Sequence, residues 1–203
     1  MSNLNILNQD SSYTFRSYFE LSYDPEDILA EFGYRFQRTR LSLPQTAKLP
    51  DNLAELRQRI DRTLPVVTLT SETARRETLV APILLEIAAF CQCQLKIEYP
   101  LAVNQWLKGT LDYLLRANNN FLVIEAKHDN ILRGFTQLAV ELIALSEWDD
   151  RHNILYGAVT IGEVWQFGQL DRQKKCITQD IDLFKVPGDL ESLFSSILGI
   201  MKR

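Results

Sequence analysis

Cysteine and histidine are scarce in this chain of 203 residues, which contains three cysteines and two histidines. Three cysteines are too few for a disulfide framework, so we expect Cys91, Cys93 and Cys176 to be buried free thiols. The Cys-x-Cys spacing is not that of a zinc knuckle, and only His128 and His152 could complete a zinc site. We therefore expect neither a zinc site nor a histidine-dependent catalytic triad.

Long apolar runs are also missing. The longest, TLVAPILLEIAAF, is interrupted by Glu86 and is too short to cross a bilayer. The segment MSNLNILNQDSS has neither the basic start nor the apolar centre of a signal peptide. These two absences lead us to expect a cytoplasmic protein with no membrane partner.

An excess of basic residues is absent as well. The 22 Lys and Arg residues stand against 26 Asp and Glu residues, which gives a net charge of −4. This balance provides no general attraction to nucleic acid, so any contact with DNA must be local. For each basic cluster taken alone, a solvated surface is the favoured interpretation. The clusters are Arg35, Arg38 and Arg40; Arg75 and Arg76; and Arg172, Lys174 and Lys175.

The hydrophobic pattern changes near residue 70. Residues 1–70 combine aromatic residues, a short helix at Pro25–Phe32 and helical spacing in NLAELRQRIDRTL. We predict that they form an N-terminal lobe of uncertain shape packed on the core. Residues 71–203 then form the main domain.

The main domain alternates helices and strands. Ser71 is placed to cap a helix over ETARRETLVAPILLEIAAF. Three strands (LKIEYPLAV, GTLDYLLR and FLVIEAK), a helix (ILRGFTQLAVELIALSEW) and a strand (ILYGAVTIG) follow, then a hairpin around RQKK and a last helix after Pro187 and Gly188. The order α-β-β-β-α-β predicts an α/β (α+β) fold, with a mixed central sheet flanked by helices.

The segment ANNN, between GTLDYLLR and FLVIEAK, predicts a tight turn because Asn tolerates left-handed backbone. A loop of two or four residues pairs Arg116 with Phe121. Continuing this register places Asp112 directly opposite Glu125, and Lys127 lies two residues further along the same face.

Two facing carboxylates repel each other unless a positive charge lies between them or one carries a proton. A divalent cation with oxygen ligands meets this need, and the ammonium of Lys127 would lie beside it. The alternative is a ladder of surface charges in which Lys127 neutralises Asp112 and Glu125 at a solvent-exposed edge.

The order of strand, Asp, turn, apolar strand and Glu-x-Lys resembles the PD-(D/E)xK nuclease superfamily, which has the restriction-endonuclease-like fold. The resemblance covers roughly residues 71–162 in the core order α-β-β-β-α-β. Asp112 is the acid of the first motif, and Glu125-Ala126-Lys127 is the second motif. Leu111 stands where the family name has proline.

The resemblance also implies a glutamate on the first core helix and a glutamine on the helix after the second motif. Extending the apolar stripe of the first helix backward from Val80 favours Glu77 as that glutamate, with Glu72 as the second choice. Gln137 fits the position of the glutamine. The alternatives for Glu77 are a pair with Arg76 or a first-turn charge that favours the helix dipole, and the alternative for Gln137 is an ordinary exposed polar residue.

The family implies a metal-dependent nuclease that hydrolyses DNA. Asp112, Glu125, Glu77 and the carbonyl of Ala126 would hold Mg²⁺ or Mn²⁺. Lys127 would act on the attacking water and the phosphate, and Gln137 would position the lysine or the DNA backbone.

For contacts with nucleic acid we predict Arg38, Arg40, Arg76 and Lys108. Two other functions remain open. The chain could be a nuclease fold without turnover that binds nucleic acid, or a protein-interaction subunit that docks a protein partner or forms a homodimer.

Overall fold

The computed structural model describes residues 6–117, 120–127 and 129–202. A mixed, open sheet of eight strands forms its centre, with the order β1-β7-β6-β5-β4-β3-β2 and with β8 paired to β6. The β4–β5 and β1–β7 pairs are parallel and the others are antiparallel. The strands are β1 (Arg35–Thr39), β2 (Gln94–Ala102), β3 (Lys108–Arg116), β4 (Phe121–Ala126), β5 (Ile154–Thr160), β6 (Val164–Asp171), β7 (Cys176–Asp180) and β8 (Phe184–Lys185).

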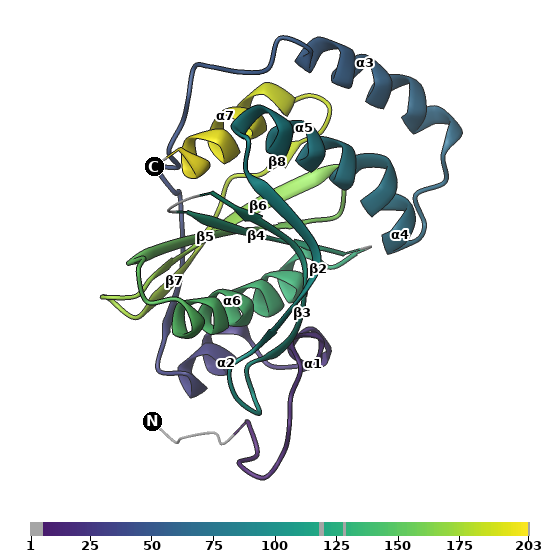
Figure 1. Cartoon of the computed structure of the whole chain (residues 1–203). Helices are drawn as coiled ribbons and strands as arrows, with labels where there is room; N and C mark the ends of the chain where they lie inside the picture. The colour runs from purple at the N-terminus through teal and green to yellow at the C-terminus, as the bar shows by residue number, and fades with distance from the viewer. Residues whose placement is uncertain (1–5, 118–119, 128, 203) are drawn as a thin grey trace.

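Helices cover both faces of the sheet, as Figure 1 shows. On one face α3, α5 and α7 pack over a core that includes Ile83, Trp165 and Phe194. On the other face α1, α2 and α6 enclose a second core around Phe135. The helices are α1 (Phe15–Glu20), α2 (Pro25–Glu31), α3 (Leu53–Thr63), η1 (Leu64–Val66), α4 (Glu72–Arg75), η2 (Arg76–Val80), α5 (Ala81–Cys91), α6 (Ile131–Trp148) and α7 (Leu190–Met201).

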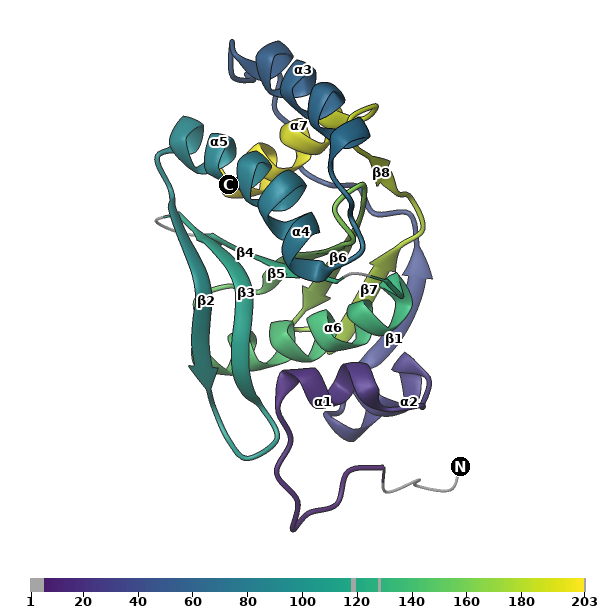
Figure 2. The ribbon, with the colours of Figure 1, turned by 90° about the vertical axis from the view of Figure 1, so that its right-hand side faces the viewer.

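The predicted order α-β-β-β-α-β is confirmed from α4 to β5. Residues 6–70 are spread over the domain. Helices α1 and α2 lie against α6, β1 joins the sheet as an edge strand beside β7, and α3 lies on the opposite face (Figure 2). The segment predicted as an N-terminal lobe therefore supplies parts of both faces and one edge of a single layered structure.

The first core helix is interrupted by a π-turn. Ser71 caps it as predicted, since its Oγ accepts a hydrogen bond from the backbone N–H of Ala74 at 3.0 Å. Pro82 has no backbone N–H to donate, and the N–H of Ala81 bonds to the carbonyl of Arg76, five residues back. The π-turn contains one residue more than a turn of α-helix, so the side chains of the preceding residues Glu72–Arg75 are rotated about the helix axis from where an unbroken α-helix would place them.

Helix α6 crosses from β4 to the parallel strand β5 and is buried on all sides from Gly134 to Ser146. The sheet covers one side of this helix, and α1 and α2 cover the other. Polar side chains of α6 therefore lie inside the protein. Within the described ranges, no helix is long and apolar enough to cross a membrane.

Two of the three cysteines differ from the prediction. Cys91 and Cys93 form a disulfide, so the prediction that they are free thiols is wrong. Gln92 adopts a left-handed conformation (φ 54°) at the end of α5, and the chain turns there so that the two Cα atoms lie 5.3 Å apart. Cys176 is free and buried, as predicted.

Candidate active site

The site lies where β3 and β4 separate. The predicted pairing of Arg116 with Phe121 is confirmed, and the ladder continues to Tyr113 and Ile124. It ends there, one pair before the predicted pairing of Asp112 with Glu125. The carboxylate of Asp112 enters the gap between the strands, and its Oδ2 accepts a hydrogen bond from the backbone N–H of Ala126 at 2.9 Å.

This hydrogen bond also fixes the direction of the Ala126 carbonyl. In a strand, the N–H and C=O of one residue point to the same side, as the paired hydrogen bonds of a ladder require. The N–H of Ala126 points toward β3, whereas the next N–H, of Lys127, bonds to Thr160 of β5 at 2.8 Å. The carbonyl of Ala126 therefore faces the side on which Asp112 lies.

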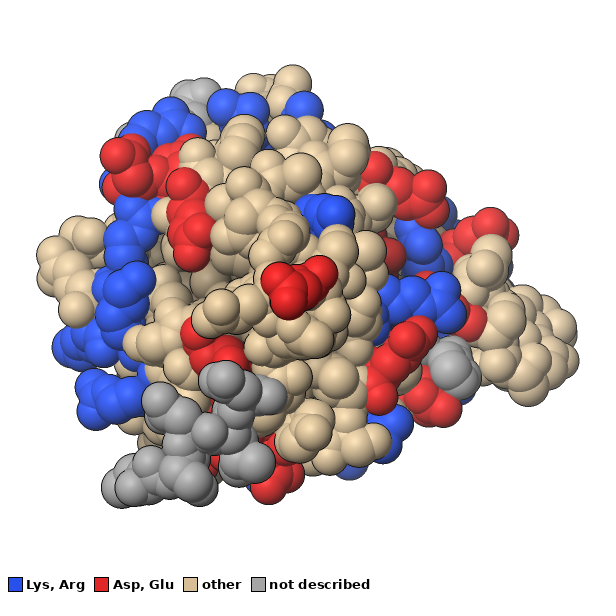
Figure 3. Space-filling view, turned by 90° about the horizontal axis from the view of Figure 1, so that it is seen from below, with Lys and Arg blue, Asp and Glu red and all other residues tan. Residues whose placement is uncertain are grey.

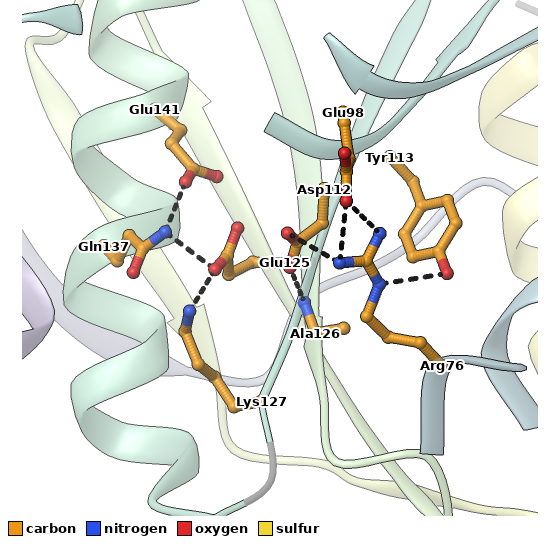
Figure 4. Close-up of polar contacts among 9 residues, drawn as sticks. All are labelled: Arg76, Glu98, Asp112, Tyr113, Glu125, Ala126, Lys127, Gln137 and Glu141. Carbon is orange, nitrogen blue, oxygen red and sulfur yellow. Dashed lines mark hydrogen bonds and ion pairs between the residues drawn. The ribbon is translucent and has the colours of Figure 1, made fainter. Parts of the chain in front are cut away.

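Glu125 is the last residue but one of β4 and is only 1% exposed. Its Oε1 forms an ion pair with the ammonium of Lys127 and accepts a hydrogen bond from the amide nitrogen of Gln137 at 2.7 Å (Figure 4). Its Oε2 is buried and makes no hydrogen bond with the described residues. Burying a carboxylate is costly, so a half-satisfied one at the wall of a cavity marks a place for a positive ligand or a proton.

Gln137 is buried, which rules out the alternative of an exposed polar residue. Its amide nitrogen bonds at once to Glu125 and to Oε1 of Glu141, the latter at 2.8 Å. Its own Oε1 is buried without a partner among the described residues. Gln137 therefore joins helix α6 to the end of β4.

Glu141 is a site residue that was not predicted. It is fully buried one turn beyond Gln137, and Figure 4 shows its free oxygen turned toward Glu125. Burial raises the pKa of Glu141 to about 8. Burial also raises the pKa of Glu125, and the neighbouring Glu141 adds to this effect. A proton held between the two carboxyl groups relieves their repulsion.

Replacing Glu141 by glutamine is expected to stabilise the protein, and more so at high pH. An unfolded glutamate ionises near pH 4.5, whereas Glu141 in the folded chain keeps its proton up to about pH 8. The folded state thus binds more protons, so the free energy of unfolding of the wild type falls as pH rises between these values. Glu141→Gln removes this loss, on the order of 3 kcal/mol at pH 7.

Urea unfolding of both proteins at pH 4.5 and pH 8 measures this difference. The exposed Glu147→Gln, on the same helix, is the matched control and should show no such dependence. A stability difference between wild type and Glu141→Gln that is equal at the two pH values would show that Glu141 is ionised in the folded protein.

Arg76 approaches Asp112 from the π-turn. Its guanidinium lies 3.7 Å from Oδ1 of Asp112 and 3.5 Å from Glu98, and it stacks 5.1 Å above the ring of Tyr113. Figure 4 shows Arg76 between Glu98 and Asp112. Arg76, which we predicted to contact nucleic acid, thus already neutralises one acid of the site.

These side chains border a cavity of about 420 Å³. The sheet and α6 provide Asp112, Glu125, Lys127 and Gln137, as predicted. The remaining lining residues are Thr14, Arg16, Phe19, Glu72, Gly109 and Thr110.

The glutamate of the first core helix that reaches this cavity is Glu72, the second choice, while Glu77 is exposed. Counting back from Val80 assumed an unbroken α-helix. The π-turn over Arg76–Val80 shifts the phase, so the face that Glu77 would have occupied is displaced. The aromatic wall from α1 was not predicted either, and the only sequence signal for it is the aromatic run YTFRSYF.

Gly134 allows α6 to approach Lys127 closely. A Cβ atom on Gly134 would lie 2.7 Å from Cγ2 of Val159 and 3.1 Å from Cγ of Lys127. The missing side chain therefore lets the helix press the lysine stem toward Glu125.

The other predicted DNA contacts do not line the cavity. Arg38 is exposed on the edge strand β1, and Arg40 forms an ion pair with Asp182 at 2.7 Å. Lys108 begins β3, two residues before Thr110 of the cavity wall. The pairing of β1 with β7 brings Arg35 beside Lys175. Figure 3, which views the molecule from below, shows basic side chains gathered along the left edge of that view.

Comparison with known proteins gives no family: no protein-family model matches the chain, and no curated protein matches its sequence. Among the described residues, no three side chains of His, Cys, Asp and Glu are arranged as a ready metal site. Any interpretation of the cavity therefore depends on its own geometry.

Proposed function

We propose that the protein is a metal-dependent nuclease that hydrolyses DNA phosphodiester bonds and has the restriction-endonuclease-like fold of the PD-(D/E)xK superfamily. The observation that carries the proposal is the convergence of Asp112, Glu125 and Lys127 on one cavity. Asp112 and Glu125 come from neighbouring strands that separate at this point, and Lys127 is buried against Glu125. A surface charge ladder, the alternative, would not bury an acid and a lysine together.

The residues of the cavity fit Mg²⁺ or Mn²⁺. Mg²⁺ usually takes one or two carboxylates and fills its other positions with water and substrate phosphate, so a group of three acids is not required. Asp112, Glu125 with its unpartnered Oε2, and the carbonyl of Ala126 would hold the ion, with Glu72 as the further acid of the wall. Such an ion supplies a bound water of lowered pKa and neutralises charge on the phosphate.

The chain's own residues have distinct roles in this proposal. Burial disfavours charge on Lys127, but the attraction of Glu125 outweighs it and raises the pKa of Lys127, which keeps the lysine protonated. A protonated lysine orients the water and contacts a phosphate oxygen by a charge-assisted hydrogen bond. Gln137 holds Glu125 in place, and Arg76 could move from Asp112 to a phosphate when substrate enters.

A panel of DNAs tests the proposal. Linear, supercoiled, branched and single-stranded DNA would be incubated with the purified protein in Mg²⁺, Mn²⁺ or EDTA. We expect cleavage of at least one substrate with either metal and none in EDTA. No cleavage of any substrate with either metal would contradict the proposal.

One observation favours a second function, a nuclease fold that binds nucleic acid without turnover. Both oxygens of Asp112 are already engaged, one by Arg76 and the other by the backbone of Ala126. If Arg76 stays beside Asp112 when substrate binds, its positive charge opposes the binding of a divalent cation at the same carboxylate. DNA binding without cleavage, with no effect of Mg²⁺ on stability, would support this function.

A further inference from the structure

One wall of the cavity is formed by α1, and this wall is fixed. Phe15 and Tyr18 of α1 are each 1% exposed, and the hydroxyl of Tyr18 donates a hydrogen bond to the carbonyl of Trp106 at 2.8 Å. Gly109 leaves room for α1, since a Cβ atom there would lie 2.8 Å from the ring of Phe15. Figure 2 shows α1 beside α6, and α1 also contacts β3. The helix is therefore part of the site rather than a mobile cover.

Phe19 is the aromatic side chain that α1 turns toward the cavity, which α1 also lines with Arg16. Its half-buried ring lines the cavity and lies 5.1 Å from the ammonium of Lys127. Phe15 and Tyr18 already provide the contacts of α1 with the core. The ring of Phe19 instead presents an aromatic surface in a cavity whose other side chains are mostly polar, next to the lysine that would contact the phosphate.

We infer that the cavity accepts single-stranded DNA, with one unpaired base stacked on Phe19 beside the phosphate that Lys127 contacts. This inference rests on the proposed function. Aromatic side chains bind unpaired bases through the flat face of the base, which a double helix keeps covered by its neighbours in the stack. A cavity of about 420 Å³ is of the size that encloses a small molecule or one base rather than a DNA double helix.

Two threonines of the wall agree with this class of substrate. Thr14 and Thr110 are exposed at the cavity and carry hydroxyls that can bond to sugar or phosphate. The simpler role for Phe19 is structural, as an apolar cover over the pair of Lys127 and Glu125. The two roles differ in what leucine can replace, because leucine covers the pair but offers no aromatic face.

Binding without turnover separates the two roles. The full-length protein would be titrated, in EDTA, into fluorescein-labelled single strands and into duplexes of the same sequence, with fluorescence anisotropy as the readout. We expect the wild type to prefer the single strand. Phe19→Leu should lose roughly tenfold or more in affinity for the single strand, with duplex binding unchanged, and Phe19→Trp should retain the affinity.

A series of oligonucleotides with one abasic site at each successive position adds a second readout. One position should weaken binding to the wild type but have no further effect on Phe19→Leu, because both changes remove the same stacking contact. The series on the wild type remains informative if Phe19→Leu does not fold.

The inference is overturned if the wild type binds duplex as tightly as single strand, or if Phe19→Leu binds single strands like the wild type. It is also overturned if the loss of affinity caused by Phe19→Leu and the loss caused by the abasic site add. These outcomes are independent of cleavage. A protein that binds single strands through Phe19 but cuts nothing would refute the nuclease and leave the inference intact. Cleavage of DNA, combined with no effect of Phe19 on binding, would support the nuclease and refute the inference.

Discussion

Replacing Lys127 by methionine is expected to lower the rate of DNA cleavage by about 10²- to 10⁴-fold, the usual contribution of a group that transfers or orients a proton. The affinity for DNA should change little. The contact of Lys127 with the phosphate strengthens as charge develops in the transition state, so its loss affects the rate more than binding. Methionine keeps most of the length of the lysine stem while it removes the ammonium, which lies 5.1 Å from the ring of Phe19. Single-turnover cleavage and anisotropy measure the two quantities.

The matched control is Lys96→Met. Lys96 also lies over an aromatic ring, 4.9 Å from that of Tyr99, but on β2 and outside the cavity. Its replacement should leave the rate unchanged. Because removing Lys127 leaves Glu125 buried without its cation, both variants must be assayed below their melting temperatures. Equal rates for wild type and Lys127→Met would remove the lysine from the mechanism.

Mg²⁺ or Mn²⁺ is expected to raise the melting temperature of the wild type, and Asp112→Asn should abolish the rise. A ligand at 100 times its dissociation constant stabilises the folded state by about 2.7 kcal/mol, or roughly 5–10 °C for a chain of this size. Asparagine keeps an oxygen that can accept the N–H of Ala126, so the metal-free variant should remain folded. Thermal unfolding with and without metal measures the effect.

Asp182→Asn provides the comparison, because Asp182 is an exposed acid that pairs with Arg40. It should keep the full response to metal. An equal rise in the wild type and in Asp112→Asn would place the ion elsewhere on the protein.

Much of the site was predictable because it depends on local rules. The turn predicted at ANNN, of which residues 118 and 119 lie outside the described ranges, led to the register of the hairpin that the strands show. A period of two predicted Glu125 and Lys127 on one face. Gln137, one helix later, was indicated by the resemblance to the PD-(D/E)xK superfamily. These residues lie within 26 positions of one another, and short-range geometry is sufficient to bring them together.

The parts that were missed depend on long-range packing or on a local irregularity. No pattern within residues 14–19 shows that α1 will lie on α6 and close the cavity with Phe19. Glu141 has the sequence signature of an exposed helical charge, but it is buried because the fold places its carboxyl beside Gln137 and the Glu125 side chain of β4. The choice of Glu77 over Glu72 failed to find the acid in the wall because a π-turn is not visible in the spacing of apolar residues.

The central claim is that Asp112 and Glu125 hold one divalent cation between them. Crystals soaked in Mn²⁺ and measured at the manganese absorption edge test it directly. We expect an anomalous peak about 2.1 Å from an oxygen of each carboxylate, beside the carbonyl of Ala126, with Arg76 moved away from Asp112. A cavity without such a peak, in crystals that bind Mn²⁺ at other acids and keep Arg76 paired with Asp112, would contradict the claim.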